Sequence, residues 1–158
     1  MVKLPSQLRT PEVGSFAIAN CTFTVDDEHF KYHELPAGTA VLVVEVCGMT
    51  TRLGQKYGMK IVHDEKAYYV PRSIMMNFLY CKPGFSLANK SFCITGDLTF
   101  IRPMYATLIR LSGGEYKSGV SGNLGYLITN ETRLSTKMRK AKQLGTSIIT
   151  EDQFMGML

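Results

Sequence analysis

The stretch S-F-C-I-T-G, from Ser91 to Gly96, decides the fold of the second half of this 158-residue chain. Its centre is short, apolar and rich in residues that favour β-structure, and a glycine ends it, so we predict a buried strand. Beyond it the apolar period changes from that of a strand to that of a helix. Met104, Leu108 and Leu111 recur at helical spacing, which predicts a helix from Pro103 to Leu111.

The remaining elements of this half alternate in the same way. We predict strands at Tyr116 to Val120, Gly125 to Thr129 and Ser147 to Thr150, and helices at Ser135 to Leu144 and Glu151 to Met157. Short buried strands that alternate with helices are typical of a parallel sheet with helices on both of its faces.

Several motifs of this half occur in a family-specific order. They are F-C-I-T-G-D-L at residues 92–98, G-G at 113–114, G-V-S at 119–121, G-Y-L-I-T at 125–129, S-T-K-M-R-K-A-K-Q-L-G at 135–145 and I-I-T-E-D-Q-F at 148–154. In this order and spacing, residues 85–158 resemble the BRCT family. The resemblance is greatest to the BRCT domains of bacterial NAD-dependent DNA ligases and of the replication factor C large subunit. It implies an α/β domain with a four-stranded parallel sheet and three helices.

The resemblance also implies a phosphate-binding site. In phosphate-binding BRCT domains a Ser/Thr-Gly pair ends the first strand and a lysine opens the second helix; Thr95, Gly96 and Lys137 match these positions. We call these three residues the phosphate corner. A hydroxyl, an unobstructed backbone N–H and a cation are the groups that a phosphate requires. The alternative is that Thr95 and Gly96 only form a turn and that Lys137 is one more solvated lysine.

Positive charge is concentrated in the same half. The whole chain has a net charge of +5. Residues 1–86 carry nine basic and eight acidic side chains, a net charge of +1, and residues 87–158 carry nine basic and five acidic ones, a net charge of +4. Such a patch favours a polyanionic partner, here DNA, although it is also compatible with a solvated helix face. The candidate contacts to the DNA backbone are Arg102, Arg133, Arg139, Lys140 and Lys142. In domains of the replication factor C type an arginine stands near the start of the first helix, and Arg102 lies one residue from that place.

The first half is predicted to be mainly β. Cys81-Lys82-Pro83-Gly84 contains a Pro-Gly turn signal, so we place the boundary between the domains, residues 1–84 and 85–158, at this point. Consecutive strands with short turns predict a small barrel, OB-like or SH3-like. Strands are expected at Phe16 to Val25, Thr39 to Val46, Tyr57 to His63 and Ala67 to Val70, followed by a helix at Ser73 to Tyr80.

This half is weakly similar to small barrels of viral and phage single-strand-binding proteins. Cations and aromatic faces for a single strand could come from Arg52, Lys56, Tyr57, Tyr68, Tyr69 and Arg72. The alternative is that the tyrosines pack in the core of the barrel.

Catalysis is not expected. The ligase adenylation motif K-x-D-G, the P-loop and the nucleophile elbow are all absent from the sequence, and the cysteines and histidines lack the spacing of a metal site. We therefore expect no enzymatic activity, cofactor or metal. The sequence contains no apolar run of the roughly 20 residues that a membrane span requires. We expect an intracellular, cytoplasmic and nucleoid-associated protein without a membrane partner.

These features predict a non-catalytic, DNA-associated adaptor for replication or repair. Its BRCT domain would bind 5′-phosphorylated DNA ends or nicks. Two alternatives remain open. One is a protein-interaction module that binds phosphopeptides or uses a phosphate-independent surface. The other is a viral or phage protein that captures a host replication, repair or transcription component.

Overall fold

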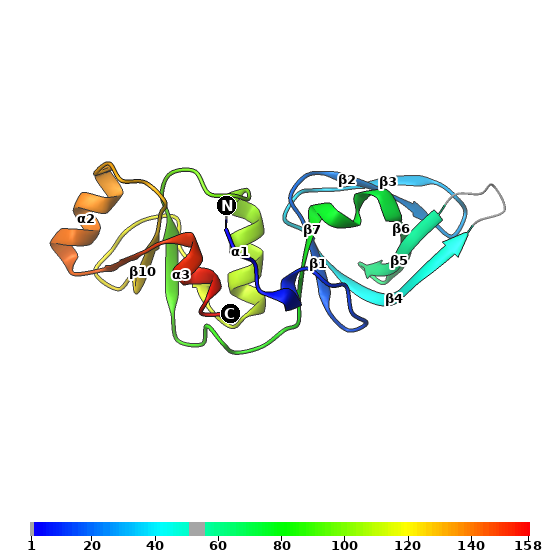
Figure 1. The fold of residues 1–158 in the computed structure, drawn as a ribbon, viewed down its shortest axis with the longest axis horizontal. Coiled ribbons are helices and arrows are strands. Elements are labelled where there is room, and N and C mark those ends of the chain that lie inside the picture. The colour runs from blue at the N-terminus through cyan, green and yellow to red at the C-terminus, as the bar shows by residue number, and fades with distance from the viewer. Residues whose placement is uncertain (1, 51–55) are drawn as a thin grey trace. The chain divides into compact units, whose positions relative to one another are not determined.

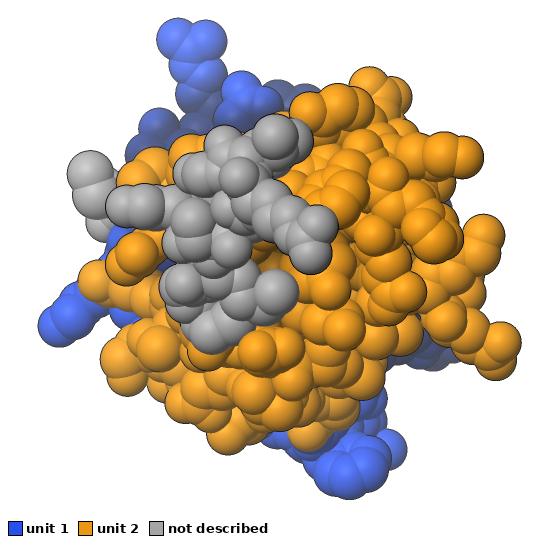
Figure 2. Space-filling model, turned by 90° about the vertical axis from the view of Figure 1, so that its right-hand side faces the viewer, with its two compact units in different colours: residues 1–5, 84–158 blue, residues 6–83 orange. Residues whose placement is uncertain are grey.

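The computed structural model describes residues 2–50 and 56–158, and leaves the side chains of residues 47–56 undescribed. It divides the chain into two compact units, which are coloured separately in Figure 2. The N-terminal unit comprises residues 6–83. The C-terminal unit comprises residues 84–158 together with the start of the chain, through Pro5. The backbone N–H of Lys3 donates a hydrogen bond to Asp152 Oδ1, at 3.2 Å, and joins this first segment to the rest of its unit.

The C-terminal unit is built on a parallel sheet. Its strands are β8 (Ser91–Ile94), β9 (Glu115–Tyr116), β10 (Tyr126–Ile128) and β11 (Ser147–Ile149), in the order β11-β10-β8-β9. Every neighbouring pair is parallel. Its helices are α1 (Arg102–Leu111), α2 (Thr136–Leu144) and α3 (Glu151–Met155). The predicted four-stranded parallel sheet with three helices is confirmed.

Alternate side chains of β8 face opposite sides of the sheet. The buried ring of Phe92 lies edge-on to Phe154 of α3, with ring centroids 5.4 Å apart. Its neighbour Cys93 belongs to a second cluster, which includes Met138 and Ala141 of α2. Helices therefore cover both faces of the sheet, with α1 and α3 on one side and α2 on the other (Figure 1).

Helix α2 has strong signals at both ends. The Ser135 side chain caps its start by accepting a hydrogen bond from the backbone N–H of Met138, at 3.2 Å. At its end Gly145 adopts a φ of 72°, and its N–H donates to the carbonyls of Ala141 and Lys142. Leu144, the last residue of α2, is 46% exposed and lies outside the core.

A buried carboxylate links α3 to three other segments of the C-terminal unit. Glu151 is 2% exposed and accepts hydrogen bonds from the backbone N–H and the hydroxyl of Thr99. It also accepts from the Tyr105 hydroxyl of α1 and from Nδ2 of Asn130, which follows β10. Burial and the bond to Glu151 raise the pKa of Tyr105 well above its ordinary value, so its hydroxyl stays a donor.

The N-terminal unit is a seven-stranded antiparallel sheet. Its strands lie in the order β3-β2-β6-β5-β4-β1-β7. They are β1 (Phe16–Ala19), β2 (Phe23–Asp27), β3 (Tyr32–Leu35), β4 (Ala40–Thr50), β5 (Lys56–His63), β6 (Lys66–Pro71) and β7 (Phe78–Cys81), with short 3-10 helices η1 (Ser6–Leu8) and η2 (Arg72–Asn77).

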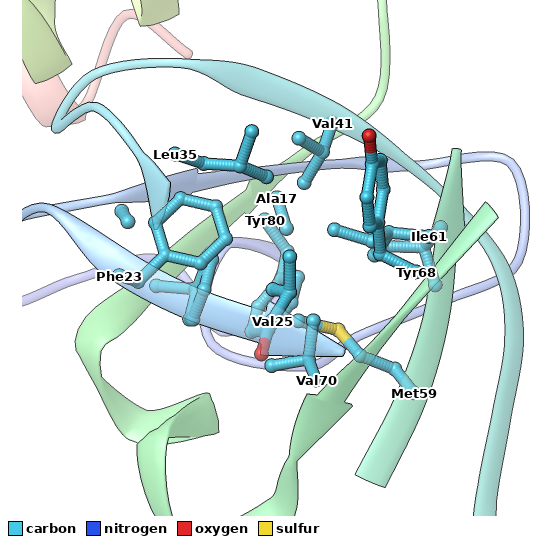
Figure 3. Close-up of a cluster of buried hydrophobic side chains, with 13 residues drawn as sticks. Ala17, Phe23, Val25, Leu35, Val41, Met59, Ile61, Tyr68, Val70 and Tyr80 are labelled. Atoms are coloured by element: carbon cyan, nitrogen blue, oxygen red, sulfur yellow. The ribbon is translucent and has the colours of Figure 1, made fainter. Parts of the chain in front are cut away.

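The sheet curls around an apolar cluster. In Figure 3 the labelled side chains of Phe23, Leu35, Val41, Met59 and Ile61, from four strands, gather in one core. Irregular pairing between β4 and β5, with register shifts after Val43 and Val46, fits a strongly bent sheet. The strand order leaves β3 and β7 as the two edges, so a closed OB-like or SH3-like barrel is not confirmed.

Two local predictions in this unit were wrong. The helix expected from Ser73 to Tyr80 is instead η2 followed by strand β7. All four residues of β7 are buried, and they pair antiparallel with β1, so contacts to a distant strand overrode the local helical pattern. The single strand expected from Phe16 to Val25 is interrupted between β1 and β2.

The N-terminal unit also buries a carboxylate. Asp26 is 3% exposed, and its Oδ2 accepts a hydrogen bond from the hydroxyl of Tyr57, which is 1% exposed. Its other oxygen, Oδ1, has no hydrogen-bond partner among the described residues. The Asp26 carboxylate therefore accepts fewer hydrogen bonds than the carboxylate of Glu151.

The turn between β2 and β3 is organised by Asp27. The backbone N–H groups of Lys31 and His29 donate to its Oδ1 at 3.0 and 2.8 Å, and His33 Nε2 lies 2.9 Å from Oδ2. The bond from Lys31, and next the one from His33, lower the pKa of Asp27 from its ordinary value of 3.8 to about 2. The ionised form thus stabilises the folded turn.

We expect Asp27→Asn to flatten the acid limb of the stability profile. A lowered carboxyl pKa contributes stability above about pH 4, and this contribution is lost as the pH falls toward 2. The thermal midpoint of the parent chain should therefore fall more steeply between pH 4 and 2 than that of Asp27→Asn. Glu28→Gln, which removes the same charge one residue away, is the control. Parallel profiles for the parent and Asp27→Asn would contradict the assignment.

Candidate functional site

The phosphate corner lies where the strands of the parallel sheet end. Thr95 and Gly96 follow β8, Ser118 lies just beyond β9, and Glu131 lies in the loop after β10. Helix α2 also starts at this edge, beside the carboxyl ends of the strands. Ligands of open α/β sheets bind at such edges, because loops and helix N-termini converge there.

Lys137 reaches across this edge to two strands. Its Nζ donates to the carbonyl oxygen of Ile94, the last residue of β8, at 3.3 Å and to that of Ser118 at 3.1 Å. Ile94 directly precedes Thr95, so these bonds hold the ammonium group beside the Thr-Gly pair. A lysine ammonium has three N–H groups, and the third can donate to a ligand.

Thr95 is joined to the start of α2 through Ser135. The hydroxyl oxygens of the two residues lie 3.4 Å apart. The Ser135 oxygen already accepts from the backbone N–H of Met138, which leaves its own hydrogen for donation. Thr95 is 7% exposed, so its hydroxyl is held at the base of the corner.

Gly96 has a backbone conformation that favours glycine. Its φ is 75°, in the left-handed region. A Cβ at this position would also lie 2.6 Å from both Cγ and Oε1 of Glu131, closer than real Cβ contacts come. Glu131 therefore lies directly against the Gly96 backbone. A larger residue at 96 would be strained by the left-handed conformation and would have to displace the Glu131 side chain.

The predicted contacts to a DNA backbone are exposed. Arg133, Arg139, Lys140 and Lys142 are exposed, in α2 or just before it. Arg102 is also exposed, at the first residue of α1. Burial raises the pKa of the Tyr116 phenol, and the positive charges of Arg102 and Arg110 oppose that shift.

The single-strand contacts predicted in the N-terminal unit are only partly available. Tyr57 and Tyr68 are 1% and 7% exposed, so their rings belong to the core and the prediction that they stack on bases is wrong. Tyr69 is partly exposed, and Lys60 Nζ lies 5.5 Å from its ring centroid. Arg72 is exposed. Arg52 lies outside the described residues, as does the Lys56 side chain.

Two further features of the structure bear on sites and membranes. Among the residues that the structure describes, no group of three or more His, Cys, Asp or Glu side chains could hold a metal ion. Within the same residues, no helix is both long enough and apolar enough to span a bilayer.

Sequence reasoning missed Ser135 and Glu131 as members of the corner. Ser135 carried a usable signal, because a serine directly before a helix is a favoured N-cap and the cap lies next to the Lys137 position. Glu131 carried none. It lies in a loop, and only the fold brings its side chain to Gly96.

Comparison with known proteins agrees with the fold of the C-terminal unit. Residues 84–158 match the model of the BRCA1 C Terminus (BRCT) domain family. The chain is 37% identical over 83 residues to a DNA ligase of Mycoplasmopsis synoviae and 42% identical over 82 residues to a DNA ligase of Treponema denticola. These alignments cover 52% and 51% of this chain, but only 12% and 13% of the ligases.

A third relative extends the alignment slightly. The DNA ligase of Mycoplasma capricolum is 34% identical over 102 residues, which is 63% of this chain and 14% of the ligase. The chain thus spans a small part of the length of these relatives. The region from residue 84 to residue 158 matches the BRCT family in sequence, and its four-stranded parallel sheet with three helices is consistent with that family's fold.

Proposed function

We propose that this chain is a non-catalytic, DNA-associated protein whose C-terminal unit binds a phosphorylated DNA end or nick. The observation that carries the proposal is the position of Lys137. Its ammonium group is held by the carbonyls of Ile94 and Ser118, next to Thr95 and Gly96. Three groups that suit a phosphate, from segments about 40 residues apart, thus meet at one edge of the sheet.

The relatives support the DNA part of this proposal. The matched proteins are named DNA ligases, and the shared region is the one that contains the corner. The exposed cations of α2 supply a further attraction to a DNA backbone. They are Arg139, Lys140 and Lys142, with Arg133 just before the helix. Such contacts carry no base specificity, so binding should weaken steeply with salt.

The same three groups would also bind a phosphorylated side chain of a protein. A hydroxyl, a backbone N–H and an ammonium recognise a terminal phosphate whatever molecule carries it. Capture of a partner from lysate that persists after nuclease treatment, with no detectable binding to DNA, would favour this second function over the first.

Replacing Lys137 or Thr95 with alanine should reduce the preference for a 5′-phosphate. We expect each variant to bind 5′-phosphorylated duplex about tenfold more weakly, because one charge-assisted or hydroxyl hydrogen bond is lost. The measurement is the ratio of affinities for 5′-phosphorylated and 5′-hydroxyl duplexes of one sequence, by fluorescence anisotropy at two salt concentrations.

Lys140→Ala is the matched control, since it removes the same charge from an exposed position of the same helix. It should weaken binding to both duplexes equally and leave their ratio unchanged. A ratio that is the same in the parent, Lys137→Ala and Thr95→Ala would exclude the corner as the phosphate site. Thermal unfolding of each variant checks that the fold is retained.

A further inference from the structure

The Glu131 side chain occupies space directly over Gly96. A Cβ on Gly96 would lie 2.6 Å from its Cγ and from its Oε1. Gly96 is the residue whose backbone N–H we assign to a bound phosphate. A carboxylate therefore rests against the backbone of the corner, on the side of Gly96 that only a glycine leaves open.

The backbone of Glu131 is anchored while its side chain is not. Its N–H donates to the hydroxyl oxygen of Thr129 at 3.0 Å, and Thr129 is 4% exposed. Glu131 itself is exposed. Among the described residues its carboxylate makes no ion pair within 4.0 Å, and Lys137 lies beyond that range. The side chain can therefore rotate into solvent without breaking a salt bridge.

We propose that Glu131 is a competing anion that guards the phosphate corner, an inference that rests on the proposed function. The carboxylate and a phosphate are both negative, and they require the same space beside Gly96. Binding of the phosphate thus requires Glu131 to leave the Gly96 backbone and turn to solvent. Glu131 therefore lowers the affinity of the phosphate corner for anions, so that anions with only a weak attraction to the corner do not bind.

The effect of the Glu131 charge on phosphate affinity has an expected size and salt dependence. Two like charges a few ångströms apart in a solvated site repel each other enough to change a binding constant about fivefold. Glu131→Gln keeps the shape of the side chain and removes its charge, so it should bind 5′-phosphorylated duplex about fivefold more tightly at low salt. The gain should shrink as salt screens the repulsion.

The test compares Glu131→Gln and Glu131→Ala with the parent chain on 5′-phosphorylated and 5′-hydroxyl duplexes. Glu115→Gln is the charge control, because it removes the same charge at β9 residue 115, whose strand partner is the first residue of β8. It also breaks the ion pair of Glu115 with Lys117, in which the charged atoms lie 3.6 Å apart. This position is at the amino end of its strand, whereas the corner lies at the carboxyl ends of the strands. The guard predicts a gain for the phosphorylated duplex in both Glu131 variants, above the gain in Glu115→Gln. Adding Lys137→Ala should abolish that gain.

The outcomes separate the guard from the proposed function. If Lys137→Ala lowers the phosphate preference but the Glu131 variants behave like Glu115→Gln, the phosphate corner stands and the guard is excluded. If the parent shows no preference and Glu131→Gln acquires one, the guard is supported and the corner of the parent is closed. If neither chain distinguishes the two duplexes, both the phosphate corner and the guard are excluded.

Discussion

Glu151→Ala is expected to lower the free energy of unfolding of the C-terminal unit by about 3–5 kcal/mol. The reason is the number of donors that the carboxylate satisfies. Thr99, Tyr105 and Asn130 all donate to it in a buried site, and each would be left without its acceptor. A buried polar group that loses its partner costs about 1–3 kcal/mol, and domains are stable by only about 5–15 kcal/mol in total.

Chemical denaturation, followed by a signal of the C-terminal unit, measures this loss. Glu131→Ala is the control, since it truncates an exposed glutamate of the same unit and should change stability by less than about 0.5 kcal/mol. Tyr105→Phe removes a single donor and should cost less than Glu151→Ala. A loss below about 1 kcal/mol in Glu151→Ala would show that the carboxylate does not hold these segments together.

Tyr57→Phe is expected to cost the N-terminal unit about 2–4 kcal/mol. The substitution removes the hydroxyl that donates to Asp26, whose other oxygen has no partner among the described residues. A buried carboxylate would then face the core without a donor. Tyr80→Phe is the control, because its hydroxyl donates to the uncharged carbonyl of Met75, at 2.9 Å, and its loss should cost only about 1 kcal/mol.

A double variant identifies the source of the Tyr57 effect. If the cost arises from the unpaired charge of Asp26, Tyr57→Phe should be much less destabilising in an Asp26→Asn background. Denaturation of the two single variants and the double variant gives the coupling directly. Additive losses would contradict the assignment and would trace the effect to packing of the ring instead.

The parallel sheet was predictable because its signals are local and agree with one another. Ser91–Ile94 is a short apolar run, and α2 has a serine cap at its start and a left-handed glycine at its end. The N-terminal unit was harder to predict. Phe78–Cys81 has no local feature that excludes a helix, and its conformation is set by pairing with β1, about 60 residues earlier in the chain.

The residues of the candidate sites also differ in how far the sequence could predict them. Thr95, Gly96 and Lys137 could be named from the sequence because the resemblance assigned their positions. The burial of Tyr57 and Tyr68 could not be decided, since alternation places a side chain on a face but does not say which face a curled sheet encloses. The contact of Glu131 with Gly96 depends on how two loops pack, and neither loop has a repeating pattern.

The hydrogen bond from Lys3 to Asp152 has a consequence for the path of the chain. Residues through Pro5 belong to the same compact unit as residues 84–158, so residues 6–83 form an insertion within that unit. Folding of the C-terminal unit therefore closes a long loop, and the entropic cost of such closure grows only with the logarithm of loop length. A fragment that begins at Gly84 would lack the segment that bonds to Asp152. A circularly permuted chain would still contain that segment.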